Sequence, residues 1–364
     1  MSTATLTPTQ GSPERSYPAY ATSLWRRVLL TREFAIIALL VLVYAYSMGN
    51  VANFDGPLTL YYLFLDMAPI LLIALPMTMI MITGQIDLSV ASVVGLSSVL
   101  VGVLHHDAGM SIPLAALVAI VVGAVCGALN GFLVSYVGLP SLAVTIGSMA
   151  LYRGIAQGLL GTTAVTDFPE KWTDLAKNRI FGQGTSYPTI LIPFVILLLL
   201  TVWLLHFSNF GRGVYEIGLN DEAAHFTGVN VETTKFWLFV FSGAVSAFAG
   251  VYYTLRYGSA RGDNATGLEL QVIAAVVLGG VSVFGGRGAL HGVVAGVLLI
   301  GVISSAMRLE GQTVNLINIV IGVLLVLSVM SSSVLALASG LLRSRNRGNR
   351  PSSRRAVAAA NNER

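Results

Sequence analysis

The sequence predicts an all-α fold, a polytopic transmembrane helical bundle of about ten spans. Hydrophobic residues make up 55% of the 364 residues and charged residues only 10%, a balance typical of membrane proteins and not of soluble domains. Ten apolar segments also follow one another along the chain. The third, fifth and eighth are short for a span, which predicts broken, tilted or partly spanning helices. The ten lie at roughly 34–49, 62–82, 88–105, 113–136, 141–160, 189–207, 236–255, 268–284, 289–307 and 314–337.

The spans define one transmembrane domain, residues 31–338, between two polar tails. Residues 1–30 are rich in Ser, Thr and Pro and contain no apolar core of a signal peptide, so a disordered cytoplasmic tail is expected. Residues 339–364 carry an arginine-rich run that predicts a second disordered tail. Such a run either anchors the topology or contacts anionic membrane lipid.

The distribution of basic residues orients the bundle. With a cytoplasmic N-terminus, 14 of the 21 Lys and Arg residues fall inside, six fall outside, and Arg153 falls within a span. This bias follows the positive-inside rule and predicts a multi-pass protein of the cell (inner) membrane with both termini in the cytoplasm. The net charge of +4 is then explained by the membrane, and nucleic acid is not expected as a partner.

Residues 208–235 form a hydrophilic interruption of 28 residues between two apolar segments. Asn220 can cap a helix there, Asp221 and Glu222 fall in its first turn, where the helix dipole favours acids, and Gly228 can end it. About two turns of helix are too short to span a membrane. The segment is therefore interpreted as a cytoplasmic docking element for a soluble partner.

Two glycine-containing breaks separate apolar helices. The first, ITGQIDLSVAS at 82–92, places Asp87 where it can cap the next helix. It is either a gate near a translocation path or a tight interhelical turn. The second, LGGVSVFGGRG at 278–288, lacks the phosphate-loop pattern GxxxxGK[ST] and favours close backbone packing over nucleotide binding.

Glycines at every fourth position follow both breaks and predict close helix packing. The similar order of helix, break and small-residue helix in the two halves suggests an internal repeat of the kind that transporters use. The two ladders are Gly123, Gly127 and Gly131, and Gly288, Gly292 and Gly296.

Polar residues at membrane depth are expected to face the bundle interior or an aqueous cavity. They include no chain of carboxylates for a proton relay, and the five histidines fit no metal or catalytic pattern. An enzyme, a metal site and a cofactor are therefore not expected. The loop at about 161–188 either receives an extracellular partner or is a solvated connector. The polar residues are Asp66, Asn130, Arg153, Gln157, Asn315 and Asn318.

Four motifs in order resemble the permease subunits of ATP-binding cassette (ABC) importers for sugars, the branch with ribose, xylose, rhamnose and autoinducer-2 systems. The resemblance covers roughly residues 34–335. The motifs are TGQIDLSVAS at 83–92, NGFLVSYVGLPSLAVTIGSMALYRG at 130–154, FGRGVYEIGLNDEAAHFTGVNV at 210–231 and VVLGGVSVFGGRG at 276–288.

The resemblance implies a core of two permease subunits, either a homodimer or a pair with a sister permease. It implies cytoplasmic ATP-binding cassette subunits, which hydrolyse ATP, and an extracytoplasmic substrate-binding protein. The polar loop corresponds to the coupling helix, although His225 stands where arginine is common, and Gln85 and Ala91 stand where glycine is common. The expected coupling residues are Glu216, Asn220, Asp221, Glu222, Ala223, Ala224, His225 and Gly228, and the candidates for the translocation path or gate are Gln85, Asp87, Ser89 and Asn130.

Two other functions remain open at this stage. A branched-chain amino acid or nucleoside permease belongs to the same superfamily, but an amino acid path should offer partners for both a carboxylate and an ammonium group. A secondary transporter or channel would work without ATP or a cassette subunit. Transport in proteoliposomes with and without these components distinguishes the possibilities.

Overall fold

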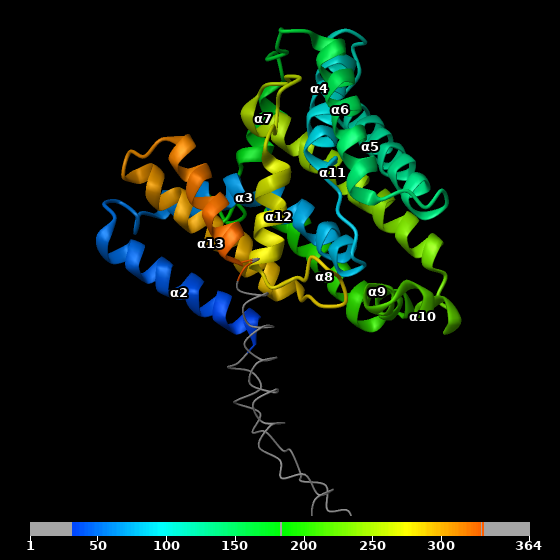
Figure 1. Cartoon of the computed structure of the whole chain (residues 1–364). Coiled ribbons are helices and arrows are strands. Elements are labelled where there is room, and N and C mark those ends of the chain that lie inside the picture. The colour runs from blue at the N-terminus through cyan, green and yellow to red at the C-terminus, as the bar shows by residue number, and fades with distance from the viewer. Residues whose placement is uncertain (1–30, 183, 329, 331–364) are drawn as a thin grey trace, which may run out of the picture.

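The computed structural model describes residues 31–182, 184–328 and 330 (Figure 1). The tails predicted at 1–30 and 339–364 lie outside this part. The described residues form helices, with two isolated β-bridges and no strand, which confirms the all-α fold class. The helices are α2 (Arg32–Asn50), α3 (Pro57–Ile82), α4 (Val90–His106), α5 (Ile112–Ser135), α6 (Ser141–Leu160), α7 (Glu170–Lys177), α8 (Leu191–Phe207), α9 (Asn209–Leu219), α10 (Asp221–Phe226), α11 (Val231–Tyr257), α12 (Leu268–Leu278), α13 (Leu290–Leu309) and a last helix, Val314–Ser328.

Every one of the ten predicted apolar segments contains a helix. By length and composition, α2, α3, α5, α11 and α13 qualify as spans, and the pair α8 and α9, bent by 70°, would be a sixth. The third and eighth segments are short, as predicted, with 17 residues in α4 and 11 in α12. The fifth is a continuous helix of 20 residues, α6. The total of ten spans stays a prediction.

The helix α3 runs through the centre of the bundle (Figure 1). It is apolar on all sides, and 89% of its most apolar window is buried, as expected for a helix surrounded by other helices. It packs against α8, α11, α12 and α13. It begins beside the segment after α7, where the Ser186 hydroxyl donates to the carbonyl of Pro57 (3.0 Å), and it ends beside α9. We call these two sides of the molecule the α7 end and the α10 end.

The predicted glycine ladders pack helices together. On α5, added Cβ atoms at Gly123, Gly127 and Gly131 would meet the backbone of α11. On α13, those at Gly292 and Gly296 would meet the backbone of α12. Helix axes approach this closely only where side chains are absent.

Replacing Gly127 by alanine is expected to destabilise the protein by about 1–3 kcal/mol, because the new Cβ would overlap the carbonyl oxygen of Phe239. Thermal unfolding of the purified protein in lipid nanodiscs measures the effect. Gly49→Ala on α2 is the matched control, since nothing lies within 4 Å of its added Cβ. Equal melting temperatures for the two variants would contradict the packing role.

Candidate functional site

The polar segment at the α10 end contains the predicted short helix. Asn220 caps α10, its side-chain oxygen accepting from the backbone N–H of Ala223 (2.8 Å). Asp221 and Glu222 lie in the first turn, and Gly228, with φ of +88°, follows the last turn. The sequence analysis missed a second helix, α9, in the same segment. Its cap is Ser208, whose side-chain oxygen accepts from the N–H of Gly211 (3.1 Å).

The helix α9 lies against both glycine-containing breaks. A Cβ on Gly218 would overlap the carbonyl oxygen of Ile82, at the end of α3. That same oxygen accepts from the N–H of Gly286 (2.8 Å), in the break after α12. The Tyr215 hydroxyl donates to the carbonyl of Gly288 (2.9 Å). The second break therefore allows close backbone packing, as predicted, and the two breaks contact each other beside α9.

The short helix α10 is fastened to α9 and α11. Its Ala224 is buried in a small apolar cluster with Ile217 and Val231. The Lys235 ammonium on α11 lies 2.5 Å from the Asp221 carboxylate. A displacement of α10 would therefore be transmitted to α11, the longest helix of the fold.

Large apolar side chains project from the α10 end. Phe226 on α10 is 92% exposed, Phe284 in the break after α12 is 86% exposed, and Leu219 on α9 is 72% exposed. The sequence analysis did not single them out. The signal for Phe226 was present, because it is an aromatic residue at the last position of a polar, capped helix of two turns. Exposed aromatic residues rimmed by polar ones mark sites for protein partners.

A cleft of about 460 Å³ opens beside α10. It is lined by the connection between α5 and α6, by Gln85, and by the polar face of α10 and the start of α11. Three acids outnumber the basic side chains there, so the cleft carries net negative charge. Gln85 is thus brought next to the predicted coupling residues. The charged and titratable residues of the lining are Asp221, Glu222, His225, Glu232 and Lys235.

The other three path candidates, Asp87, Ser89 and Asn130, are buried and bonded to one another. Asp87 Oδ1 accepts from the N–H (3.0 Å) and hydroxyl (2.6 Å) of Ser89, and Asp87 Oδ2 accepts from the Ser242 hydroxyl (2.9 Å). Asn130 donates to the Ser89 hydroxyl oxygen (2.8 Å), and the Tyr152 hydroxyl lies 3.3 Å from Asn130 Oδ1. The network joins the first break to α5, α6 and α11.

This geometry corrects one detail of the sequence analysis. Asp87 is not the cap residue of α4, because Ser89 occupies the cap position and its side chain makes no capping hydrogen bond. Asp87 lies two residues earlier and is 1% exposed. Its buried carboxylate is instead satisfied by the serines around it. A role of these residues in the translocation path stays a prediction.

Of the other polar residues predicted to face the interior or an aqueous cavity, Arg153 and Asp66 are partly buried, whereas Gln157, Asn315 and Asn318 are exposed. The Arg153 guanidinium on α6 donates to the carbonyls of Gly262 (3.0 Å), Asn264 (2.6 Å) and Ala91 (3.1 Å). On α3, Asp66 pairs with an arginine from α11 and another from α13. Backbone carbonyls and ion pairs thus compensate the charges.

The described residues thus form a helical bundle with at least five helices long and apolar enough to cross a membrane, and with a short capped helix and exposed aromatic side chains at one end. Residues 59–329 match the family model described as branched-chain amino acid transport system / permease component. The chain belongs to this family. Membership confirms the resemblance to ABC importer permeases.

Individual relatives cover most of the chain. The autoinducer 2 import system permease protein LsrD of Yersinia enterocolitica is 33% identical over 309 residues, 83% of this chain and 92% of the relative. That of Salmonella typhimurium is 32% identical over 317 residues, 85% and 93% of the two chains. That of Photorhabdus temperata is 32% identical over 311 residues, 83% and 91%. No solved structure matches.

Proposed function

We propose that this permease is the membrane subunit of an ATP-driven importer for a sugar or sugar-like solute, with autoinducer-2 as the first candidate. The relatives named above import autoinducer 2, and the chain offers amide, hydroxyl and aromatic groups at membrane depth. The observation that carries the proposal is α10, a capped helix that presents Phe226 to solvent beside an acidic cleft.

The partner at the α10 end is an ATP-binding cassette subunit in the cytoplasm, where both termini also lie. Phe226 fills an apolar pocket of this subunit, and the acids of the cleft face its basic side chains. ATP binding moves α10, and α11 follows through Ala224 and Lys235, while α9 carries the movement to the two breaks. The permease alternates its access without chemistry on the solute.

Two more partners complete the importer. A second permease subunit, identical or a sister chain, forms the other half of the translocation path, and an extracytoplasmic binding protein delivers the solute at the α7 end. Because the family is described as a branched-chain amino acid transport component, branched-chain amino acids are the second candidate class of solute. The relatives named above all belong to autoinducer 2 import systems, which favours the sugar-like class.

Reconstitution tests the proposal. The proteoliposomes contain the permease, the cassette and permease subunits encoded beside it, and the neighbouring binding protein. They are expected to take up autoinducer-2 or a pentose only when ATP is supplied on the side of the membrane where the cassettes lie. L-Leucine uptake in its place would favour the second candidate class. Uptake by the permease alone, without ATP, would overturn the importer proposal.

Replacing Ala223 by tryptophan is expected to reduce ATP-driven uptake at least tenfold while the protein stays folded, because Ala223 is exposed on α10 and a bulky side chain there obstructs docking. Ala224 is unsuitable for this test, because it is buried and a larger side chain would disturb α10 itself. Ala38→Trp, at an exposed position in the middle of α2 and away from both ends, is the control. Normal uptake by Ala223→Trp would contradict the assignment of α10.

A further inference from the structure

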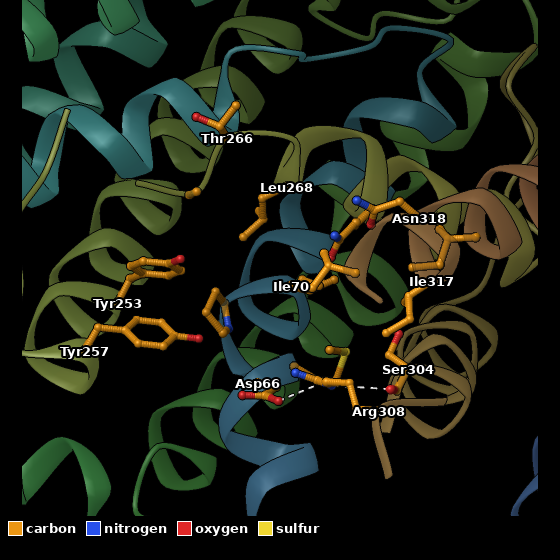
Figure 2. Close-up of a pocket in the computed structure, with 16 residues that line it drawn as sticks. Asp66, Ile70, Tyr253, Tyr257, Thr266, Leu268, Ser304, Arg308, Ile317 and Asn318 are labelled. Carbon is orange, nitrogen blue, oxygen red and sulfur yellow. Dashed lines mark hydrogen bonds and ion pairs between the residues drawn. The ribbon is translucent and has the colours of Figure 1, made fainter. Parts of the chain in front are cut away.

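A cavity of about 210 Å³ lies at the α7 end, between α3, α11, α12, α13 and the last helix (Figure 2). A water molecule occupies about 30 Å³ in the liquid, so the cavity has room for about seven waters or a solute of about ten non-hydrogen atoms. Side chains from five helices and one loop converge on it. The polar side chains that line it include Tyr253, Tyr257, Gln271, Ser304 and Asn318.

The charged groups of the cavity are bound to one another. Asp66 pairs with Arg256 through one oxygen and with Arg308 through the other, at 2.9 Å. Arg256 also donates to the carbonyl of Leu65. Both oxygens of the carboxylate are therefore already used. The group carries one positive charge in excess, which makes an acidic solute the competing occupant.

Only some of the neutral polar groups of the cavity are used within the protein, such as the Thr266 hydroxyl, which donates to the carbonyl of Asp263 (2.7 Å). Across residues 31–182 and 184–328, the side chains of Gln271, Ser304 and Asn318 make no hydrogen bond to another residue, although all three line the cavity. Tyr253 and Tyr257 lie on the opposite side, with ring centroids 4.5 Å apart (Figure 2). Free amide and hydroxyl groups that face an aromatic wall match the vicinal hydroxyl groups and the apolar face of a sugar.

Two other cavities lie along the loop after α11. The 210 Å³ cavity shares Tyr253, Ala265 and Thr266 with a cavity of about 300 Å³. This second cavity shares Arg261 and Asp263 with a third, of about 490 Å³, beside the end of α6. Both Arg261 and Asp263 are exposed. The three cavities thus follow one loop at the α7 end.

We propose that the 210 Å³ cavity is a binding site for an uncharged, polyhydroxylated solute of about pentose size, which the permease holds after delivery at the α7 end. The inference rests on the proposed function as an importer of a sugar-like solute. Gln271, Ser304 and Asn318 bind the hydroxyl groups, and Tyr253 and Tyr257 cover an apolar face of the ring. The site selects solutes within one permease chain, apart from the partner interface at the α10 end.

Binding to the full-length permease in lipid nanodiscs tests the site without the partners. Saturation-transfer NMR with autoinducer-2, D-ribose, D-xylose and L-rhamnose is expected to show saturable binding of at least one of them. Gln271→Leu and Asn318→Leu should each weaken this binding about tenfold, because a hydrogen-bond partner of a hydroxyl group is lost. Gln312→Leu is the matched control, because Gln312 is exposed at the same end and does not line the cavity.

Three results would overturn the site. The first is that none of the four solutes binds saturably, and the second is that Gln271→Leu and Asn318→Leu leave the Kd unchanged. The third is that only D-ribose 5-phosphate binds and that Arg308→Gln removes this binding. Unchanged melting temperatures of the two leucine variants show that the fold is intact. If the reconstituted importer takes up a sugar and both variants bind and transport it normally, the proposed site is wrong but the proposed function stands. If it takes up L-leucine and no sugar, the sugar-like substrate class of the proposed function fails, and the site fails with it.

Discussion

Replacing Phe226 by serine is expected to weaken binding of the cassette subunit about 30-fold. An aromatic side chain that fills a partner's pocket contributes about 2 kcal/mol or more, and each 1.4 kcal/mol is about a factor of ten in Kd. The side chain is 92% exposed in the permease, so the substitution removes almost no contact within the fold. The Kd between the cassette subunit and the permease in nanodiscs measures the effect.

A matched control for this variant is Phe181→Ser. Phe181 is 76% exposed and lies near α7, at the opposite end of the molecule, so the same chemical change there should leave cassette binding unchanged. The ATPase activity of the assembled importer should fall in parallel with binding for Phe226→Ser. An unchanged Kd for Phe226→Ser would mean that α10 docks through its polar residues, or that the cassette binds elsewhere.

Features that depend on neighbours in the sequence were predictable. The cap Asn220, the acids after it and Gly228 determine α10 through hydrogen bonds within a few residues, so the short helix was predicted correctly. The apolar segments likewise predicted the helices, because their composition alone favours helices that lie in a membrane. The helix α9 was missed since Gly211, Gly213 and Gly218 weaken a helical pattern. The structure shows that these glycines bring α9 close to its neighbours.

Contacts between distant parts of the chain were not predictable in the same way. The hydrogen bond between Asp87 and Ser242 joins residues 155 positions apart, and nothing local marks serine as the partner. The same holds for Asp66, whose two arginines come from α11 and α13. The sequence analysis identified Asp87, Ser89 and Asn130 as a group of interest. Only the fold shows that they bind one another.

Replacing Asp87 by alanine is expected to lower the free energy of unfolding by about 3 kcal/mol or more. Three donors, the N–H and hydroxyl of Ser89 and the hydroxyl of Ser242, would lose their acceptor in a buried site, and each buried group left without a partner costs about 1–3 kcal/mol. Thermal unfolding in nanodiscs measures the loss. Asp263→Ala is the control, because Asp263 is exposed.

Asn is the informative replacement at the same position. Asp87→Asn keeps an oxygen for Ser89, and its amide can donate to the Ser242 hydroxyl, which then accepts. Stability close to that of the unaltered protein is therefore expected, which separates the hydrogen bonds from the charge. If Asp87→Asn is as unstable as Asp87→Ala, the negative charge itself is required. If the hydrogen bonds of the network also link α11 to the first break, Asp87→Ala should lower the solute transported per ATP and Asp87→Asn should not, while cassette binding stays unchanged in both.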